Sequence, residues 1–249
     1  MILFSRFGKT ALTAALLGAF GGGLIAEKPA KIPSVDIVLE RNVKALGGMK
    51  AMRKIKNREA VGKILLPAFG AALPVVLRAA APNREAMELT LGPAGIVRDV
   101  FDGTEGWTET PDGNVIPKKE RELINKKTEA DFHADLNYKK NYPKIEQLGV
   151  QKIADRDVYA LKMTPKKGDT DTFFFDVKTG IVAGVDSTAE MQEKEVKTRV
   201  LFGNYKEVDG VKIPFKIQLV EPKFAAFTIT IESIKHNVKE TSHWFKKSK

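Results

Sequence analysis

From Glu59 onward, apolar and polar residues alternate along short segments that turn-forming dipeptides separate. Within Val211–Val220 every odd-numbered residue is apolar, and the residues between them include two lysines and a glutamine. Asp-Gly pairs at 102–103, 112–113 and 209–210 match the turns that connect antiparallel strands. Because successive side chains of a strand point to opposite faces, this pattern predicts an antiparallel sheet with an apolar face.

Repeated short strands with few helices predict a mainly β protein, built as one curved sheet or a barrel. The predicted strands are Glu59–Leu66, Leu73–Ala80, Arg84–Leu89, Ile96–Phe101, Gly106–Thr110, Val150–Ala154, Val158–Thr164, Thr172–Val177, Ile181–Ser187, Val196–Tyr205, Val211–Val220 and Phe227–Ser233.

Two segments outside this pattern predict helices. Ser34 is a typical N-cap with Asp36 in the first turn, and apolar residues then recur on one helical face up to Gly47. Pro117 begins a charged stretch that runs to Leu136, and proline suits the first position of a helix. The thin apolar stripe of this second helix indicates a weak attachment to the core.

Residues 1–26 have the features of a secretory signal peptide. Arg6 and Lys9 form a basic region, Ala11–Ile25 is uncharged, and small residues surround the expected cleavage site before Glu27. We expect the remaining chain, 27–249, to fold as one domain, with an uncleaved N-terminal anchor as the alternative. The formal net charge is +10, and cleavage, which removes the two basic residues, leaves +8. For an exported protein, this surplus favours contact with a membrane rather than with nucleic acid.

The chain lacks the residue patterns of familiar catalytic sites. It has no cysteine, its three histidines are scattered, and it contains no zinc-protease, serine-hydrolase or phosphate-loop motif. Glu120 and Glu122 are two residues apart, so they do not face one another on a helix. These observations argue against an enzyme and predict neither a metal nor a cofactor.

The order of several segments is similar to that of a known family. The segments are "VLERNVKALGGMKAMRKIK", "VFDGTEGWTETPDG", "TFFFDVKTGIVAGV" and "NYKEVDGVKIPFKI". Together they resemble the periplasmic lipoprotein-carrier superfamily (LolA/LolB-like), especially its outer-membrane lipoprotein-sorting branch. The resemblance implies a single unclosed antiparallel β-barrel of about eleven strands, with an N-terminal helix and a lid-like helix over the concave face. It also implies a lid arginine, for which Arg78 and Arg98 are candidates.

The function that this resemblance implies is a soluble periplasmic carrier or binder of the acyl chains of lipids or lipoproteins, with outer-membrane lipoprotein sorting as one such role. The superfamily also includes an envelope-stress sensor domain, so a sensor or interaction module with the same lipid-binding fold is the alternative. The expected partners are acyl chains and, transiently, a membrane or envelope proteins. We expect a monomer that binds no nucleic acid.

Strand periodicity selects the residues that could face an acyl chain, although it does not separate ligand contacts from ordinary core. Burial of each CH₂ group contributes about 0.8 kcal/mol, so a long acyl chain is a favourable cargo for an apolar face. The candidate ligand-binding residues are Phe69, Leu73, Met87, Leu89, Tyr159, Leu161, Met163, Phe173, Phe175, Ile213, Phe215, Ile217, Phe227 and Ile229.

Two further segments stand out. Ile64–Leu77 carries no charge and is interrupted by two prolines and a glycine. It predicts either a buried strand pair joined by a turn or an apolar hairpin whose tip, led by Phe69 and Leu73, touches a membrane or a lipid. In the second case, the hairpin and the helix that follows Pro117 would form a movable rim. The C-terminal segment "HWFKKSK" is expected to be a solvated end, with anchoring at a membrane interface as the alternative.

Overall fold

The computed structural model describes residues 32–191, 194–241 and 243–248. The strands in these ranges form one thirteen-stranded antiparallel sheet in the order β6-β5-β4-β3-β2-β1-β13-β12-β11-β10-β9-β8-β7. The sheet therefore consists of two meanders, β1–β6 and β7–β13, which join where β1 pairs with β13. Its two edges, β6 and β7, do not pair, so the predicted unclosed antiparallel architecture is confirmed.

The strands are β1 Asn57–Leu66, β2 Ala71–Ala80, β3 Arg84–Thr90, β4 Ile96–Phe101, β5 Gly106–Glu109, β6 Val115–Pro117, β7 Lys144–Ile153, β8 Arg156–Thr164, β9 Asp171–Asp176, β10 Val182–Met191, β11 Lys194–Val208, β12 Val211–Glu221 and β13 Phe227–His236. The helices are α1 Val35–Ala45, α2 Gly48–Lys54, α3 Glu120–Glu129 and α4 Tyr138–Asn141, with short 3₁₀ turns at Pro67–Phe69, Gly92–Ala94, Ala134–Leu136 and Lys223–Ala225.

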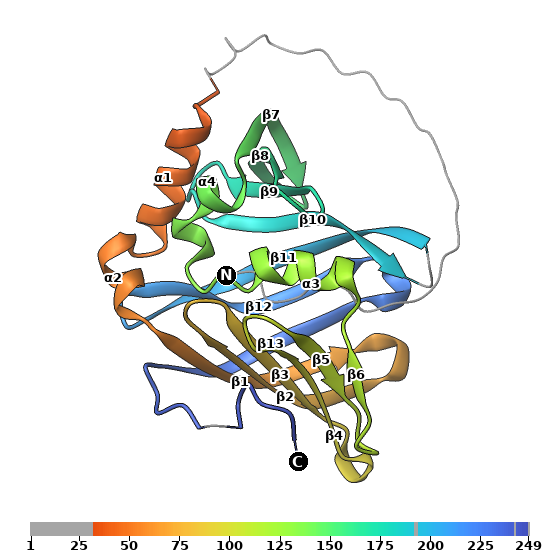
Figure 1. Cartoon of the computed structure of the whole chain (residues 1–249). Coiled ribbons are helices and arrows are strands. Elements are labelled where there is room, and N and C mark those ends of the chain that lie inside the picture. The colour runs from red at the N-terminus through yellow and green to blue at the C-terminus, as the bar shows by residue number, and fades with distance from the viewer. Residues whose placement is uncertain (1–31, 192–193, 242, 249) are drawn as a thin grey trace.

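The connection between the two sheet edges runs across the opening of the sheet. β6 ends at Pro117 and β7 begins at Lys144, and the chain between them contains α3, the 3₁₀ turn Ala134–Leu136 and α4. In Figure 1, α3 lies in the middle of the molecule, between the strands of the first meander and those of the second. We call residues 118–143 the bridging segment. The topology requires it to span the gap that the unpaired edges leave.

The sequence predicted most elements, and the differences have local causes. Ser34 caps α1 as expected, since its Oγ accepts a hydrogen bond from the Ile37 amide at 3.5 Å. β6 was missed because it has only three residues, all exposed. Pro117 closes that strand instead of opening a helix, so the prediction of one helix over Pro117–Leu136 was wrong. The helix begins at Glu120, and the Glu122 carboxylate accepts the Lys119 amide at 2.9 Å.

The main hydrophobic core covers one face of the sheet, which we call the inner face. It includes Leu77 of β2, Leu161 of β8 and Ile229 of β13, and α1 and α4 contribute Val38 and Tyr138. The opposite, outer face carries two smaller clusters, one on each meander. Successive residues of a strand point to opposite faces of the sheet. The alternation in the sequence therefore places one set of residues in the inner core and the other set on the outer face.

The C-terminal segment, described for residues 237–241 and 243–248, packs on the outer face of the first meander. Trp244 and Phe245 are only 4% and 7% exposed, and they join Ala80, Val100 and Trp107 in one cluster. The prediction of a solvated end was therefore wrong. The outer face of the sheet has an apolar patch, and the C-terminal segment shields this patch from water. Figure 1 shows this segment running from β13 around the first meander.

Candidate ligand-binding site

Most of the candidate ligand-binding residues meet on the inner face. Leu73, Leu89 and Tyr159 are partly buried and pack against its core cluster, and Ile213 lies in a neighbouring cluster with Leu46 and Met52. Phe69 is the exception, since it is 80% exposed at the tip of the β1–β2 hairpin. The candidate residues inside the core cluster are Met87, Leu161, Met163, Phe173, Phe175, Phe215, Ile217, Phe227 and Ile229.

The protein's own side chains fill this apolar interior. The ring of Phe173 lies 5.8 Å from that of Tyr138, the first residue of α4, and 5.6 Å from that of Tyr142, which follows this helix in the bridging segment. Two cavities beside this core measure about 40 and 20 Å³. Sites for drug-sized ligands measure roughly 300–1,000 Å³. For an acyl chain to enter between the sheet and the bridging segment, that segment therefore has to move away from the sheet.

Polar contacts attach α3 to both meanders. Lys126, which is buried, forms an ion pair with Glu85 on the inner face of β3. On the other side, the Arg121 guanidinium lies 3.0 Å from the Asp169 carboxylate and 2.8 Å from that of Glu195 in β11. Burial alone would lower the pKa of Lys126, but neighbouring carboxylates, Glu85 first, raise it above its usual value. The sequence predicted a helix with a thin apolar stripe, and in the structure ion pairs attach α3 to the sheet.

Buried and partly buried hydrogen bonds hold the second half of the bridging segment. The Tyr138 hydroxyl donates to Asp135 at 2.7 Å and accepts a bond from Asn42 of α1 at 3.4 Å. Asn42 also accepts the Val182 amide at 3.2 Å, so one side chain links α1, α4 and β10. The His133 Nε2 lies 3.2 and 3.1 Å from two backbone carbonyls, those of Met52 and Ile55. These contacts fix the segment against the inner face.

Arg58 is the arginine that points from the sheet toward the bridging segment. It lies on β1, its Nε donates to His236 Nε2 at 3.1 Å, and its guanidinium lies 5.6 Å from the centre of the Phe132 ring. Burial lowers the pKa of Arg58 to about 10, although the negative charge of Asp135 opposes the shift. The sequence contained one signal for it: Arg58 shares the strand face of Ala60 and Ile64, where a charge is unusual.

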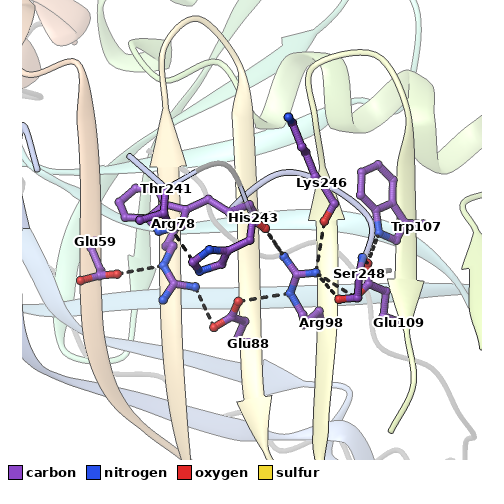
Figure 2. Close-up of polar contacts among 11 residues, drawn as sticks. Glu59, Arg78, Glu88, Arg98, Trp107, Glu109, Thr241, His243, Lys246 and Ser248 are labelled. Carbon is purple, nitrogen blue, oxygen red and sulfur yellow. Dashed lines mark hydrogen bonds and ion pairs between the residues drawn. The ribbon is translucent and has the colours of Figure 1, made fainter. Parts of the chain in front are cut away.

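Arg78 and Arg98, the predicted candidates for a lid arginine, instead lie on the outer face, away from the bridging segment. They belong to a charge ladder across five neighbouring strands, which Figure 2 shows. Arg78 reaches Glu59 at 2.8 Å and Glu88 at 2.7 Å. Arg98 reaches Glu88 at 3.1 Å and Glu109 at 2.8 Å. Their strand parity, opposite to that of Leu77 and Val97, accounts for this position.

The C-terminal segment completes the charge ladder (Figure 2). The Arg98 guanidinium donates to the backbone carbonyls of His243 at 2.7 Å and Lys246 at 3.2 Å. Ser248 donates to Glu109 from its hydroxyl at 2.6 Å and from its amide at 3.0 Å. The Arg78 guanidinium lies 5.2 Å from the centre of the Trp244 ring. The ladder therefore holds this segment, and these two arginines have a structural role.

Within the described ranges, no group of three or more His, Cys, Asp or Glu side chains could hold a metal ion. No helix in those ranges has the length and apolar character needed to cross a bilayer. The predicted signal peptide, residues 1–26, lies outside the described residues.

Comparisons with known proteins identify the fold. No family model matches the sequence, and no curated protein matches it. A solved structure described as an outer membrane lipoprotein-sorting protein domain, from Vibrio parahaemolyticus, superposes with a TM-score of 0.56 at 10% identity, over 84% of this chain and 97% of that one. A LolA superfamily protein from Nitrosomonas europaea gives 0.57 at 10% identity, over 86% and 99%. A DUF1329 family protein from Desulfovibrio piger gives 0.57 at 13% identity, over 85% and 97%.

The architecture is that of an unclosed antiparallel sheet whose apolar face is covered by helices. More specifically, it is the fold of the LolA superfamily and of outer-membrane lipoprotein-sorting proteins, which confirms the resemblance noted in the sequence at the level of the fold. At these identities, the function has to be argued from the residues of this chain.

Proposed function

We propose that this protein is an exported carrier of acyl chains, which it binds between the inner face of the sheet and the bridging segment. One observation carries the proposal: a large apolar face is covered by a segment that ion pairs and hydrogen bonds hold in place. Polar contacts can exchange for contacts with water when the segment lifts, whereas the apolar face then needs a new apolar partner. An acyl chain supplies that partner.

The rest of the proposal follows from the sequence. The chain is exported to the periplasm with residues 1–26 as signal peptide, and 27–249 form the carrier domain. The apolar candidates on the inner face contact the cargo, and the exposed Phe69 at the hairpin tip meets the membrane or the donor of the chain. The fold neighbours named for lipoprotein sorting support lipoprotein acyl chains as cargo. None of their names describes an enzyme.

Native mass spectrometry tests this function. The protein is purified from the cell envelope without detergent and measured as isolated, then after incubation with palmitate and with a tripalmitoylated lipopeptide. We expect a bound species whose added mass corresponds to an acyl-chain lipid. A protein that is uniformly free of lipid as isolated, and that takes up neither probe in vitro, would overturn the proposal.

A further inference from the structure

A surface groove beside the bridging segment is large enough to hold part of a ligand. It measures about 610 Å³, is open to solvent, and lies between α1 and α2 on one side and the bridging segment on the other. Figure 1 shows α1, α2 and α4 together on the left side of the molecule. Sites for small ligands measure roughly 300–1,000 Å³. The groove therefore has room for apolar groups from outside the protein.

Apolar and basic side chains line this groove together. The apolar ones come from α1, α2 and the bridging segment, and they are Leu39, Val43, Met49, Leu136 and Tyr138. Met49 is 49% exposed. Three exposed lysines also line the groove: Lys44, Lys139 and Lys140. This combination suits an amphiphile that carries an anionic head group.

α2 extends the basic surface beyond the groove. Lys50 lies three and four residues before Arg53 and Lys54, so the three cations share one face of the helix. Met52 is buried in the cluster that attaches α2 to the sheet. In the part of the chain that the structure describes, these three exposed cations and the neighbouring Lys56 form no ion pair. They are therefore available to an anionic partner.

The carboxylates at the groove do not offset its cations. Asp36 lies 2.7 Å from Lys139, and Asp135 accepts a hydrogen bond from the Tyr138 hydroxyl at 2.7 Å. Glu40 is exposed at the same groove and is outnumbered by the lysines. A surface with a surplus of cations is attracted to anions. A bilayer with anionic lipids presents many phosphates in one plane, which matches cations spread over a helix and a groove.

Building on the proposed carrier function, we infer that α2 and this groove dock the protein on a bilayer that contains anionic phospholipid. The cations of α2 face lipid phosphates, and Met49 and the groove take up apolar parts of the lipids. The bridging segment borders the groove from Asp135 to Lys140, so docking places the bilayer beside the segment that has to move for cargo to enter. Phe69 lies at the opposite end of β1 from α2, which leaves the hairpin tip for the donor of the chain.

Vesicle sedimentation of the mature protein tests this surface. Vesicles of phosphatidylcholine alone are compared with vesicles that also contain about 30% phosphatidylglycerol, at a salt concentration of about 0.1 M. We expect the anionic vesicles to bind at least about tenfold more tightly. Lys50→Gln/Arg53→Gln/Lys54→Gln should weaken binding to the anionic vesicles at least about tenfold, because each cation near an anionic surface contributes to the attraction.

The matched control is Lys162→Gln/Lys166→Gln/Lys167→Gln. It removes the same charge from three exposed lysines in β8 and the loop that follows, and it should bind like the wild type. Equal binding of both kinds of vesicle by the wild type, or an equal loss in the two triple variants, overturns the docking surface.

A fluorescent label tests the orientation on the bilayer. The chain has no cysteine, so an introduced one is labelled alone. A polarity-sensitive dye on Met49→Cys should shift its emission to shorter wavelength on anionic vesicles, whereas the same dye on Lys167→Cys should not. A dye on Met49→Cys that responds to protein concentration instead of vesicles assigns the groove to a second copy of this chain and overturns the bilayer as its occupant.

Palmitate uptake separates this inference from the carrier function. A wild-type protein that takes up palmitate but binds neither kind of vesicle overturns the docking surface and leaves the carrier function intact. Binding to anionic vesicles through α2 without uptake of any lipid probe overturns the carrier function and leaves the docking surface. If Lys50→Gln/Arg53→Gln/Lys54→Gln does not fold, the comparison of the two labelled positions decides.

Discussion

At the scale of single residues, a substitution of Phe69 should reduce the uptake of cargo without reducing the stability of the fold. Its ring is 80% exposed, so Phe69→Asp removes little packing and should change the melting midpoint by no more than about 2 °C. A carboxylate in the path of an acyl chain is costly to desolvate, so uptake of palmitate should fall at least about tenfold. Thermal unfolding and palmitate uptake are measured on the same sample.

Val150→Asp is the control for Phe69→Asp, since Val150 is also exposed but lies on the edge strand β7. It should leave uptake at the wild-type level. A Phe69→Asp variant that melts many degrees early would show that the hairpin tip is part of the core, and normal uptake by a stable variant would remove the tip from the cargo path.

Glu109 makes the stability of the outer face depend on pH. Burial alone would raise its pKa, but hydrogen bonds from Ser248, Trp107 and Arg98 lower it from the ordinary 4.5 to about 2. A carboxyl whose pKa is lower in the folded state stabilises that state above the unfolded pKa, and this contribution is lost as the pH falls through the folded pKa. Glu109→Gln should therefore melt below the wild type at pH 7.

The difference in melting midpoint between wild type and Glu109→Gln should shrink as the pH falls from about 4.5 to about 2. Glu105→Gln, which alters an exposed carboxylate on the turn before β5, should show a much smaller difference throughout. A constant difference across this pH range would mean that hydrogen bonds to Glu109 do not depend on its charge.

At the scale of elements, the ion pair between Lys126 and Glu85 should govern how often α3 leaves the sheet. Removal of one partner of a buried pair costs about 3–5 kcal/mol, and 3 kcal/mol corresponds to an increase of about 100-fold in the open population. In Lys126→Met, hydrogen exchange of the α3 amides should accelerate by that factor, while β12 and β13 keep their protection. The exposed neighbour Lys127→Met serves as control. Unchanged exchange in Lys126→Met would show that other contacts hold the helix.

The C-terminal segment should behave as part of the fold. Trp244→Ala removes a buried ring from the outer cluster, which costs about 3 kcal/mol and should lower the melting midpoint by roughly 6–12 °C. Lys246→Met keeps the carbonyl that accepts from Arg98 and should melt like the wild type. A Trp244→Ala protein with an unchanged midpoint would contradict a structural role for the segment.

At the scale of the whole molecule, the sequence predicted what local periodicity controls. Alternation along each strand identified the inner-face residues, because parity within a strand decides the face. It could not place Arg58 against His236, because they meet only through the pairing of β1 with β13. Nor could it place Trp244 against Arg78, because they meet only when the C-terminal segment packs on the outer face. Arg78 and Arg98 differ from these cases, because their strand parity, opposite to that of Leu77 and Val97, already assigns them to the outer face.

The pairing of β1 with β13 determines how late in its synthesis the protein can complete folding. Residues 58–65 of β1 pair with residues 228–236 of β13, so every intervening element must be synthesised before these two strands can pair. Until then, β1 presents an unpaired edge and the first meander lacks the cover of Trp244 and Phe245. In the export that we propose, which begins at the N-terminus, the first meander would therefore remain an incomplete and aggregation-prone sheet until β13 and Trp244 had crossed the membrane.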